Sequence, residues 1–263
     1  MKAQLIDGKR ISAEIKAEAA EEAAALKAKG ITPCLAVVLV GDDSASQIYV
    51  NNKKKACEAV GIRSVSHVLS GGTTEEALLE LIAKLNADKD IHGILVQMPV
   101  PKQIDERKVI LAIDPKKDVD CFHPVNVGNL HTGGEGFLPC TPAGIIELIK
   151  RSGHSIEGKQ CVVIGRSNIV GKPVAMLLMQ ENGTVTICHS RTRNLAEICR
   201  GADIIVSAVG KVNTVTADMV KEGAILIDVG MNRNEAGKLC GDVDFENVKE
   251  IAGAITPVPG GVG

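Results

Sequence analysis

Residues 159–181 read KQCVVIGRSNIVGKPVAMLLMQE, and this stretch decides the fold of the second half of the chain. The β-branched and aliphatic run at 161–164 predicts a buried strand, and the apolar residues at 172–181 predict a helix. The loop from Gly165 to Gly171 lies where a Rossmann unit binds phosphate, because the following helix offers free N–H groups to an anion. Ser167 replaces the middle glycine of G-x-G-x-x-G, so the loop alone is equally well explained as an ordinary glycine turn.

The same alternation of strand and helix extends outward in both directions. After the glycine loop we expect strands at 184–190, 202–210 and 224–230, with helices at 172–181, 194–200 and 216–222. Before the loop we expect strands at 34–41, 63–70 and 91–99. We expect helices at 9–29 and 44–60, a third that opens at Thr73, and a fourth around 104–113. This pattern predicts an α/β protein with a parallel sheet wound on both faces. Thr141 is the expected N-cap of a helix with Pro142 at its first position, near the boundary between domains at 1–139 and 140–263.

Composition and charge exclude several classes of protein. Aromatic residues make up only 2% of the chain, so the core must be aliphatic. Residues 1–139 carry 17 basic and 19 acidic side chains, and residues 140–263 carry 13 of each, which argues against a nucleic-acid partner. Neither a membrane span nor a secretory signal is visible. The eight cysteines occur singly and the six histidines form no ligand cluster, so we expect no metal and a reducing cytoplasm.

The end of the second strand in the glycine-loop domain indicates the cofactor. Many NAD-binding units carry an acidic residue there for the ribose, whereas this chain has His189, Ser190 and Arg191. Serine and arginine suit a 2′-phosphate, and Arg166 supplies a second cation, so the sequence favours NADP. The candidate cofactor residues are Gly165, Arg166, Ser167, Val170, Gly171, Ser190, Arg191, Thr192 and Gly210.

The first half of the chain holds the candidate catalytic residues. Tyr49 and Lys53 are four apart on an expected helix and therefore share a face, although a surface tyrosine beside a solvated lysine run is the simpler interpretation. The Tyr-x-x-x-Lys pair of short-chain dehydrogenases is excluded by order, because here it precedes the glycine loop. Gln97 ends an aliphatic strand, where α/β sheets bind ligands, but a purely structural amide is an equal alternative. Asp120 is a candidate recognition carboxylate, and Asp118 is expected to form a turn.

Taken together, these motifs resemble the bifunctional methylenetetrahydrofolate dehydrogenase–methenyltetrahydrofolate cyclohydrolase family. The resemblance runs in order along nearly the whole chain. The matching stretches are SQIYVNNK (46–53), VQMP (96–99), KDVD (117–120), PCTP (139–142), GRS (165–167), VGKP (170–173), HSRT (189–192), DVG (228–230), GDVD (241–244) and TPVPGGVG (256–263).

The resemblance implies an N-terminal folate domain and a C-terminal NADP-binding domain, with the active-site cleft between them, and a homodimer. It implies NADP-dependent oxidation of 5,10-methylenetetrahydrofolate, followed by hydrolysis of the methenyl cation to 10-formyltetrahydrofolate. Asp120 would bind the pterin, Tyr49 would stack on the p-aminobenzoate ring, and Lys53, oriented by Gln97, would assist removal of a proton from the attacking water. Pro259, Gly260 and Gly261 would complete the substrate site.

Three departures from the family pattern accompany this interpretation. Cys121 replaces a common glycine, Val100 replaces a common leucine, and the sequence stops at Gly263, where the family continues with a helix that returns to the first domain. Either the chain given is truncated or that helix is absent, and domain closure and stability depend on which. A monofunctional NAD(P)-dependent dehydrogenase and a catalytically silent dinucleotide-binding regulator are the alternatives. An acidic residue in place of Ser190-Arg191 would have supported the monofunctional dehydrogenase. Loss of Lys53 or Gln97 would have supported the regulator.

Overall fold

The chain divides into two units, each built around its own parallel sheet. The computed structural model describes residues 3–263, without the side chains of Ser44 and Ala45. The first unit comprises Ala13–Leu138, and the second comprises Pro139–Gly263 together with the N-terminal segment through Ser12. The structure departs from the expected boundary at 139/140 in two respects: the division falls one residue earlier, between Leu138 and Pro139, and the N-terminal segment through Ser12 belongs to the second unit.

The N-terminal segment joins the second unit through a short strand. β1 (Gln4–Leu5) pairs in parallel with β11 (Ala254–Ile255) at the edge of the sheet. Ile6 is fully buried, and the Gly8 amide donates to the Gly260 carbonyl at 3.0 Å. A two-residue strand is too short to show a hydrophobic period, so sequence patterning gave no sign of this pairing.

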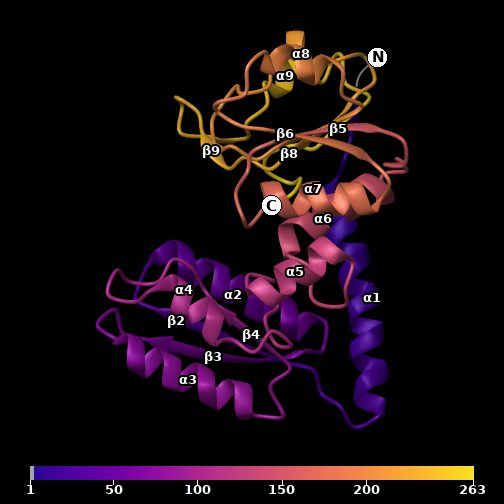
Figure 1. Ribbon diagram of the computed structural model, residues 1–263. Coiled ribbons are helices and arrows are strands. Elements are labelled where there is room, and N and C mark those ends of the chain that lie inside the picture. The colour runs from indigo at the N-terminus through magenta and orange to yellow at the C-terminus, as the bar shows by residue number, and fades with distance from the viewer. Residues whose placement is uncertain (1–2) are drawn as a thin grey trace. The chain divides into compact units, whose positions relative to one another are not determined.

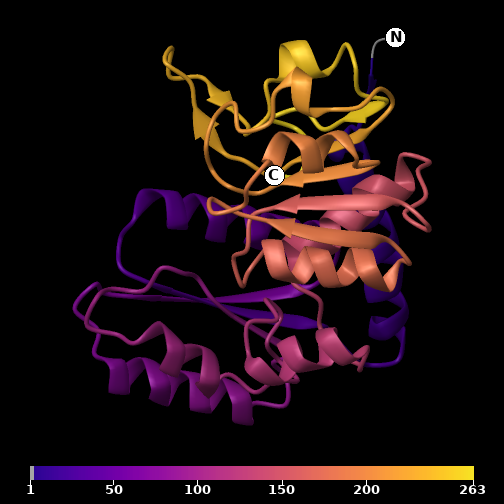
Figure 2. The ribbon, with the colours of Figure 1, turned by 45° about the horizontal axis from the view of Figure 1, so that its top comes forward.

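In the first unit, an aliphatic sheet has helices on both faces. The strand order is β3 (Arg63–Leu69), β2 (Cys34–Val40), β4 (Gly93–Val96), all parallel. On one face, α2 (Ser44–Ala59) packs Val50 against Val37, Leu39 and Leu95. α3 (Glu75–Ala87) and α4 (Glu106–Ala112) lie on the other face of the sheet (Figure 2). Their buried apolar side chains form a larger cluster with those of the sheet. These are the expected layers of a buried parallel sheet.

Local capping explains where the helices of this unit begin and end. The Thr74 hydroxyl accepts the Ala77 amide at 3.2 Å, which starts α3 as the sequence predicted. α1 (Gly8–Ala28) starts in the second unit and continues into this one, and Gly30 follows its end with a positive φ. The sequence did not predict α5 (Pro124–Thr132), although Pro124 opens it and Gly133 ends it in the left-handed region.

In the second unit, six strands form one sheet within the described residues. Their order is β1, β11, β8 (Ile225–Asp228), β7 (Ile204–Ser207), β5 (Gln160–Ile164), β6 (Thr184–Cys188). As Figure 1 shows, α6 (Cys140–Arg151) and α7 (Gly171–Gln180) lie below this sheet, and α8 (Leu195–Arg200) and α9 (Phe245–Val248) lie above it. The 3₁₀ turn η1 (Ala217–Met219) packs with α8, and β9 (Asn232–Arg233) and β10 (Leu239–Cys240) form a small antiparallel pair.

Two sequence predictions for this unit were wrong in detail. The helix expected at 216–222 is only η1, because Val220 is already extended. Thr141 is not the cap of α6, which begins at Cys140 after Pro139 and has no side-chain cap bond. Pro142 is tolerated there because the first amides of a helix have no intrahelical partner to lose.

Each sheet has a topological switch point, which positions the candidate ligand-binding residues of its own unit. In the first unit the chain leaves β2 for β3 on one side and later places β4 on the other side. In the second unit it leaves β5 for β6 and then returns to place β7 on the opposite side, so the order β6-β5-β7-β8-β11 is of the flavodoxin-like doubly wound type. Ligands of such sheets bind at the carboxyl ends of the strands, in the crevice at the switch point.

Candidate active site

Lys53 and Gln97 meet at the switch point of the first unit. Lys53 lies on α2, the crossover that follows β2, and Gln97 follows β4 directly. The Lys53 Nζ donates to Gln97 Oε1 at 3.0 Å, and the Gln97 Nε2 donates to the Met98 carbonyl at 2.8 Å. The second bond fixes the amide so that its oxygen faces the lysine. Lys53 is half-buried whereas Lys54 and Lys55 are exposed, so it is not simply part of a solvated lysine run.

The amide of Gln97 offers Lys53 a neutral hydrogen-bond acceptor. Its oxygen accepts an N–H bond from either an ammonium or a neutral amine, whereas a carboxylate would favour the ammonium. Gln97 is itself held by its backbone, since its amide donates to the Val38 carbonyl at 2.8 Å. The pair is therefore organised to orient the amine of Lys53.

Asp120 stands beside this pair on a segment that extends the sheet. The Ile94 amide donates to the Lys117 carbonyl at 2.7 Å, and Ile94 bridges in parallel to Asp118. Burial raises the pKa of Asp120, while the charge of Lys53 opposes this and that of Asp118 adds to it. Asp120 is thus a half-buried carboxyl group within the electrostatic reach of Lys53.

Asp118 is the structural carboxylate of this segment. It is 2% exposed, and its Oδ2 accepts the His123 amide at 2.8 Å and the Asn126 Nδ2 at 3.0 Å. Its carbonyl accepts the Cys121 amide at 3.2 Å, which makes the turn expected from the sequence. Cys121 has φ +58°, in the left-handed region that favours glycine.

Tyr49 lies one helical turn before Lys53 on α2. Its side chain is 54% exposed, and the neighbouring Ile48 is 60% exposed. Two exposed apolar residues on the helix that carries the lysine give a surface on which a flat aromatic group can stack. The structure thus brings Lys53 and Gln97 into contact, with Asp120 in electrostatic reach and Tyr49 on the same helix.

The glycine loop of the second unit depends on close backbone packing. A Cβ on Gly165 would lie 2.5 Å from the Ala208 carbonyl oxygen, and one on Gly171 would lie 2.3 Å from the Gly165 carbonyl oxygen. Gly165 also has φ +131°. The loop after β5 therefore packs against the loop after β7, at the switch point of the larger sheet.

Ser167 caps the helix that follows this loop. Its Oγ accepts the amides of Val170 and Gly171, both at 3.2 Å. Those amides are thus already bonded, and the hydroxyl hydrogen of Ser167 is left to donate to a ligand. Val170 immediately precedes α7 and contributes no side-chain cap.

The loop after β6 exposes the expected cation. Ser190 and Arg191 are exposed, as is Arg166 in the loop after β5. Thr192 shapes the turn, since its Oγ1 accepts the His189 amide at 2.8 Å. In residues 3–263 no carboxylate forms an ion pair with Arg166 or Arg191, so both guanidinium groups are available to a phosphate.

Gly210 and the segment 259–261 also lie in the second unit. Gly210 has φ +70°, and its amide donates to Asp242 Oδ2 at 3.2 Å, so that N–H is not free for a ligand. Gly261 and Gly8 approach so closely that a Cβ on Gly8 would collide with the Gly261 carbonyl. Pro259, Gly260 and Gly261 line a small cavity with residues 228–231. Sequence reasoning missed Asp228 and Asp242, although both lie in motifs quoted above.

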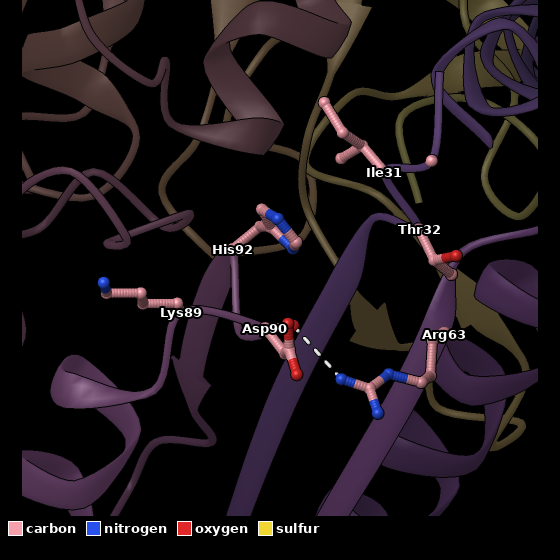
Figure 3. A pocket seen from close by; sticks show the side chains of 7 residues that line it. Ile31, Thr32, Arg63, Lys89, Asp90 and His92 are labelled. Atoms are coloured by element: carbon pink, nitrogen blue, oxygen red, sulfur yellow. Dashed lines mark hydrogen bonds between the residues drawn. The ribbon is translucent and has the colours of Figure 1, made fainter. Parts of the chain in front are cut away.

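A cavity of about 480 Å³ lies at the amino ends of the strands of the first sheet, opposite the end that carries Gln97 (Figure 3). Thr32, Arg63 and His92 line it where strands β2, β3 and β4 begin, and Arg63 donates to the Asp90 carbonyl at 3.1 Å. Because ligands of parallel sheets bind at the carboxyl ends, this cavity is not part of the candidate active site.

Among the residues that the structure describes, no cluster of side chains is suited to hold a metal ion. Within residues 3–263 all the cysteines are free thiols. No helix of this described part is long and apolar enough to cross a membrane.

The fold and the site define a class of two-domain α/β enzymes with a dinucleotide-binding domain. Residues 6–120 match the catalytic domain of tetrahydrofolate dehydrogenase/cyclohydrolase, and residues 139–263 match its NAD(P)-binding domain. The chain belongs to the tetrahydrofolate dehydrogenase/cyclohydrolase family, which confirms the resemblance and the fold class predicted from the motifs.

Individual relatives agree with this assignment. The bifunctional protein FolD of Agathobacter rectalis is 60% identical over 261 residues, which cover 99% of this chain and 94% of the relative. The crystal structure of the bifunctional FolD enzyme, a methylenetetrahydrofolate dehydrogenase/cyclohydrolase, from Campylobacter jejuni matches with a TM-score of 0.96 and 52% identity, covering 99% of this chain and 93% of that one. The Trypanosoma brucei enzyme, whose structure contains NADP cofactor and an inhibitor, has a TM-score of 0.92 and 42% identity over 100% of this chain and 92% of that one.

Proposed function

We propose that this chain catalyses two consecutive reactions on one folate. In the first, a hydride passes from the methylene carbon of 5,10-methylenetetrahydrofolate to NADP⁺, which gives NADPH and the methenyl cation. In the second, water attacks the amidinium carbon, loses a proton, and the ring opens to 10-formyltetrahydrofolate. The observation that carries the proposal is the Lys53–Gln97 hydrogen bond at the carboxyl end of β4, in the domain matched to the family's catalytic domain.

Lys53 is the base of the hydrolytic step in this proposal. A neutral amine accepts the proton of the attacking water, and Gln97 keeps it oriented from the other side through its fixed amide oxygen. A positively charged methenyl group beside Lys53 disfavours the ammonium by charge repulsion, which prepares the amine for this role.

Asp120 and Tyr49 bind the folate. A carboxylate presents two acceptors to the paired N–H donors of the pterin edge, and burial strengthens such charge-assisted bonds. The exposed ring of Tyr49 stacks on the p-aminobenzoate group. Pro259, Gly260 and Gly261 are proposed to complete the substrate site.

NADP is the proposed cofactor, bound at the switch point of the second sheet. Gly165, Ser167, Val170, Gly171 and Gly210 border the pyrophosphate and nicotinamide end through backbone and the Ser167 hydroxyl. Ser190, Arg191 and Arg166 bind the 2′-phosphate, and Thr192 supports their loop. The NADP complex of the Trypanosoma brucei relative supports this choice.

Two further parts of the proposal are assembly, which rests on the family resemblance, and location, which rests on the cysteine pattern. The chain forms a homodimer, which sedimentation velocity tests directly. It works in the cytoplasm, and the lack of disulfide bonds in the described residues is compatible with a reducing compartment.

The test follows NADPH and the methenyl chromophore in one reaction. Purified protein is mixed with methylenetetrahydrofolate and either NADP⁺ or NAD⁺, and the methenyl cation is then supplied alone. NADPH formation together with loss of added methenyl absorbance supports the bifunctional enzyme. NADPH formation without hydrolysis would indicate a monofunctional dehydrogenase, and cofactor binding without either reaction would indicate a regulator.

A further inference from the structure

Asp242 is a buried carboxylate that no part of the proposed chemistry uses. It is fully buried, and no lysine or arginine forms an ion pair with it in residues 3–263. Its two oxygens instead accept hydrogen bonds from neutral donors. These are Ser207 Oγ (3.1 Å), Val209 N (2.8 Å) and Gly210 N (3.2 Å) at Oδ2, and Lys211 N (2.9 Å) and Asn232 Nδ2 (2.9 Å) at Oδ1.

Three of these donors are consecutive amides of the loop that follows β7. Successive peptide N–H groups converge on one anion only when the backbone turns around it. A buried carboxylate without its donors would be costly, so the loop and Asp242 hold each other in place. The side chain of one residue thus determines the path of residues 209–211.

This loop forms one wall of the switch point at which a dinucleotide binds. β7 neighbours β5 in the sheet, and the Ala208 carbonyl oxygen packs against Gly165 closely enough to exclude any Cβ there. The loop after β6, with Ser190 and Arg191, lies on the other side of β5. Asp242 therefore acts on the wall of the crevice that is remote from the proposed 2′-phosphate site.

Asp228 anchors Asp242 in turn. Asp228 Oδ1 accepts the amides of Asp242 (2.8 Å) and Gly230 (3.0 Å), and its Oδ2 accepts that of Val243 (2.9 Å). A Cβ on Gly230 would lie 2.2 Å from Asp242 Oδ1, and one on Gly241 would lie 1.9 Å from Asp228 Oδ2. The DVG and GDVD motifs thus form one interlocked unit, which explains why glycine is required at both positions.

We propose that Asp242 is a positioning residue for the dinucleotide: its carboxylate gathers the amides of Val209, Gly210 and Lys211 and so shapes the β7 side of the cofactor crevice. The inference rests on the proposed function, because it assumes that NADP⁺ binds at this switch point.

The test compares the whole cofactor with a fragment in the full chain. In the Asp242→Asn variant an NH₂ group replaces one acceptor oxygen and faces other donors. We expect the Kd of NADP⁺ to rise by about tenfold or more. The Kd of adenosine 2′,5′-bisphosphate, which reaches the loops after β5 and β6, should change by less than about twofold, as measured by calorimetry.

Asp203→Asn is the matched control. Asp203 also accepts a backbone amide, from Gln160 at 2.7 Å, and binds Lys221 at 2.6 Å, but it lies at the amino end of the sheet. Its loss should lower the melting temperature without changing either Kd. If Asp242→Asn does not fold, Ser207→Ala removes one donor and should raise the Kd of NADP⁺ selectively by a smaller factor.

The outcomes separate this inference from the proposed function. Failure of the wild-type chain to bind NADP⁺ would contradict the proposed function. Normal wild-type binding with an unchanged NADP⁺ affinity in Asp242→Asn, or in Ser207→Ala where only that variant folds, would overturn the positioning role. Equal losses for NADP⁺ and for the fragment would also overturn it, because they would indicate a general structural defect.

Discussion

The two units build their sites in opposite ways. In the first unit the candidate catalytic groups are side chains that act on one another: Lys53 donates to Gln97, and its charge acts on the half-buried Asp120. In the second unit the crevice is formed largely by backbone. There Ser167 and Asp242 bond to main-chain amides, and the side chains suited to bind phosphate, Arg166 and Arg191, are exposed and unpaired with any described carboxylate.

This difference follows from what each site is proposed to do. Proton transfer needs a few groups with controlled charge and distance, so they must be fixed before substrate arrives. A dinucleotide is long and anionic, so it is bound by a crevice of suitable shape with cations at its rim. The first unit should therefore be sensitive to chemistry at single atoms, and the second to loop geometry.

The largest expected effect is that of Lys53→Met, which keeps the aliphatic stem and removes the amine. Hydride transfer moves no proton in its chemical step, whereas hydrolysis of the methenyl cation needs a base worth roughly 10²–10⁴-fold. The variant should lose cyclohydrolase activity by that factor, lose less dehydrogenase activity, and accumulate methenyltetrahydrofolate. NADPH and methenyl absorbance are followed together.

Lys54→Met is the control for this prediction, because Lys54 is the exposed neighbour on the same helix. It should retain both activities. Equal loss of both activities in Lys53→Met would reduce Lys53 to a binding residue, and full retention of hydrolysis would remove it from the mechanism.

Asp120→Asn should weaken folate binding by about 10- to 100-fold while leaving NADP⁺ affinity nearly normal. An amide offers one acceptor and one donor where the pterin presents two donors. Calorimetry with each ligand measures both affinities. Loss of cofactor affinity with normal folate affinity would contradict the role of Asp120.

The same variant should be more stable than wild type at neutral pH. Burial raises the pKa of Asp120. At a pH between the ordinary and the raised pKa, the folded chain therefore keeps a proton on Asp120 that the unfolded chain has released. Wild-type stability therefore falls as pH rises through that window, and the asparagine variant avoids this loss. Melting temperatures should converge at acid pH and diverge towards neutral pH. The argument would be contradicted if the stability of the variant minus that of wild type decreased from acid to neutral pH.

Arg191→Ala should weaken NADP⁺ by at least about tenfold and leave NAD⁺ affinity unchanged, since one charge-assisted phosphate contact is worth about 1.5–3 kcal/mol. Arg193→Ala, which removes another exposed guanidinium two residues further on, is the control and should have little effect. An unchanged ratio of the two cofactor affinities in Arg191→Ala would show that the 2′-phosphate is bound elsewhere.

The sequence predicted the side-chain site better than the backbone site. Residue type, helical spacing and strand ends made Tyr49, Lys53, Gln97 and Asp120 candidates, and the family resemblance suggested their roles; the structure joins Lys53 to Gln97 by a hydrogen bond. Asp242 was not recognised, because its partners come from 207–211 and 232, and only the fold brings those segments together. The strand β1 was missed and the length of η1 was overestimated for a related reason, because two or three residues are too few to show a hydrophobic period.

The smallest predicted effect concerns the backbone next to Asp120 in the first unit. Cys121 follows Asp120, is 3% exposed, and has φ +58°. A residue with a Cβ costs about 1–2 kcal/mol in this region, whereas glycine does not. At an ordinary buried position alanine is more stable than glycine; here Cys121→Gly should be more stable than Cys121→Ala by about 1 kcal/mol. Chemical denaturation of both variants measures the order.

Cys34 is equally buried but lies in β2 without a positive φ, so its alanine variant should be the more stable of its pair. The normal order at both positions would mean that the turn relaxes without cost. The reversed order at Cys121 alone would show that a Cβ strains the left-handed turn that follows Asp120, a backbone requirement in the unit whose site is otherwise built from side chains.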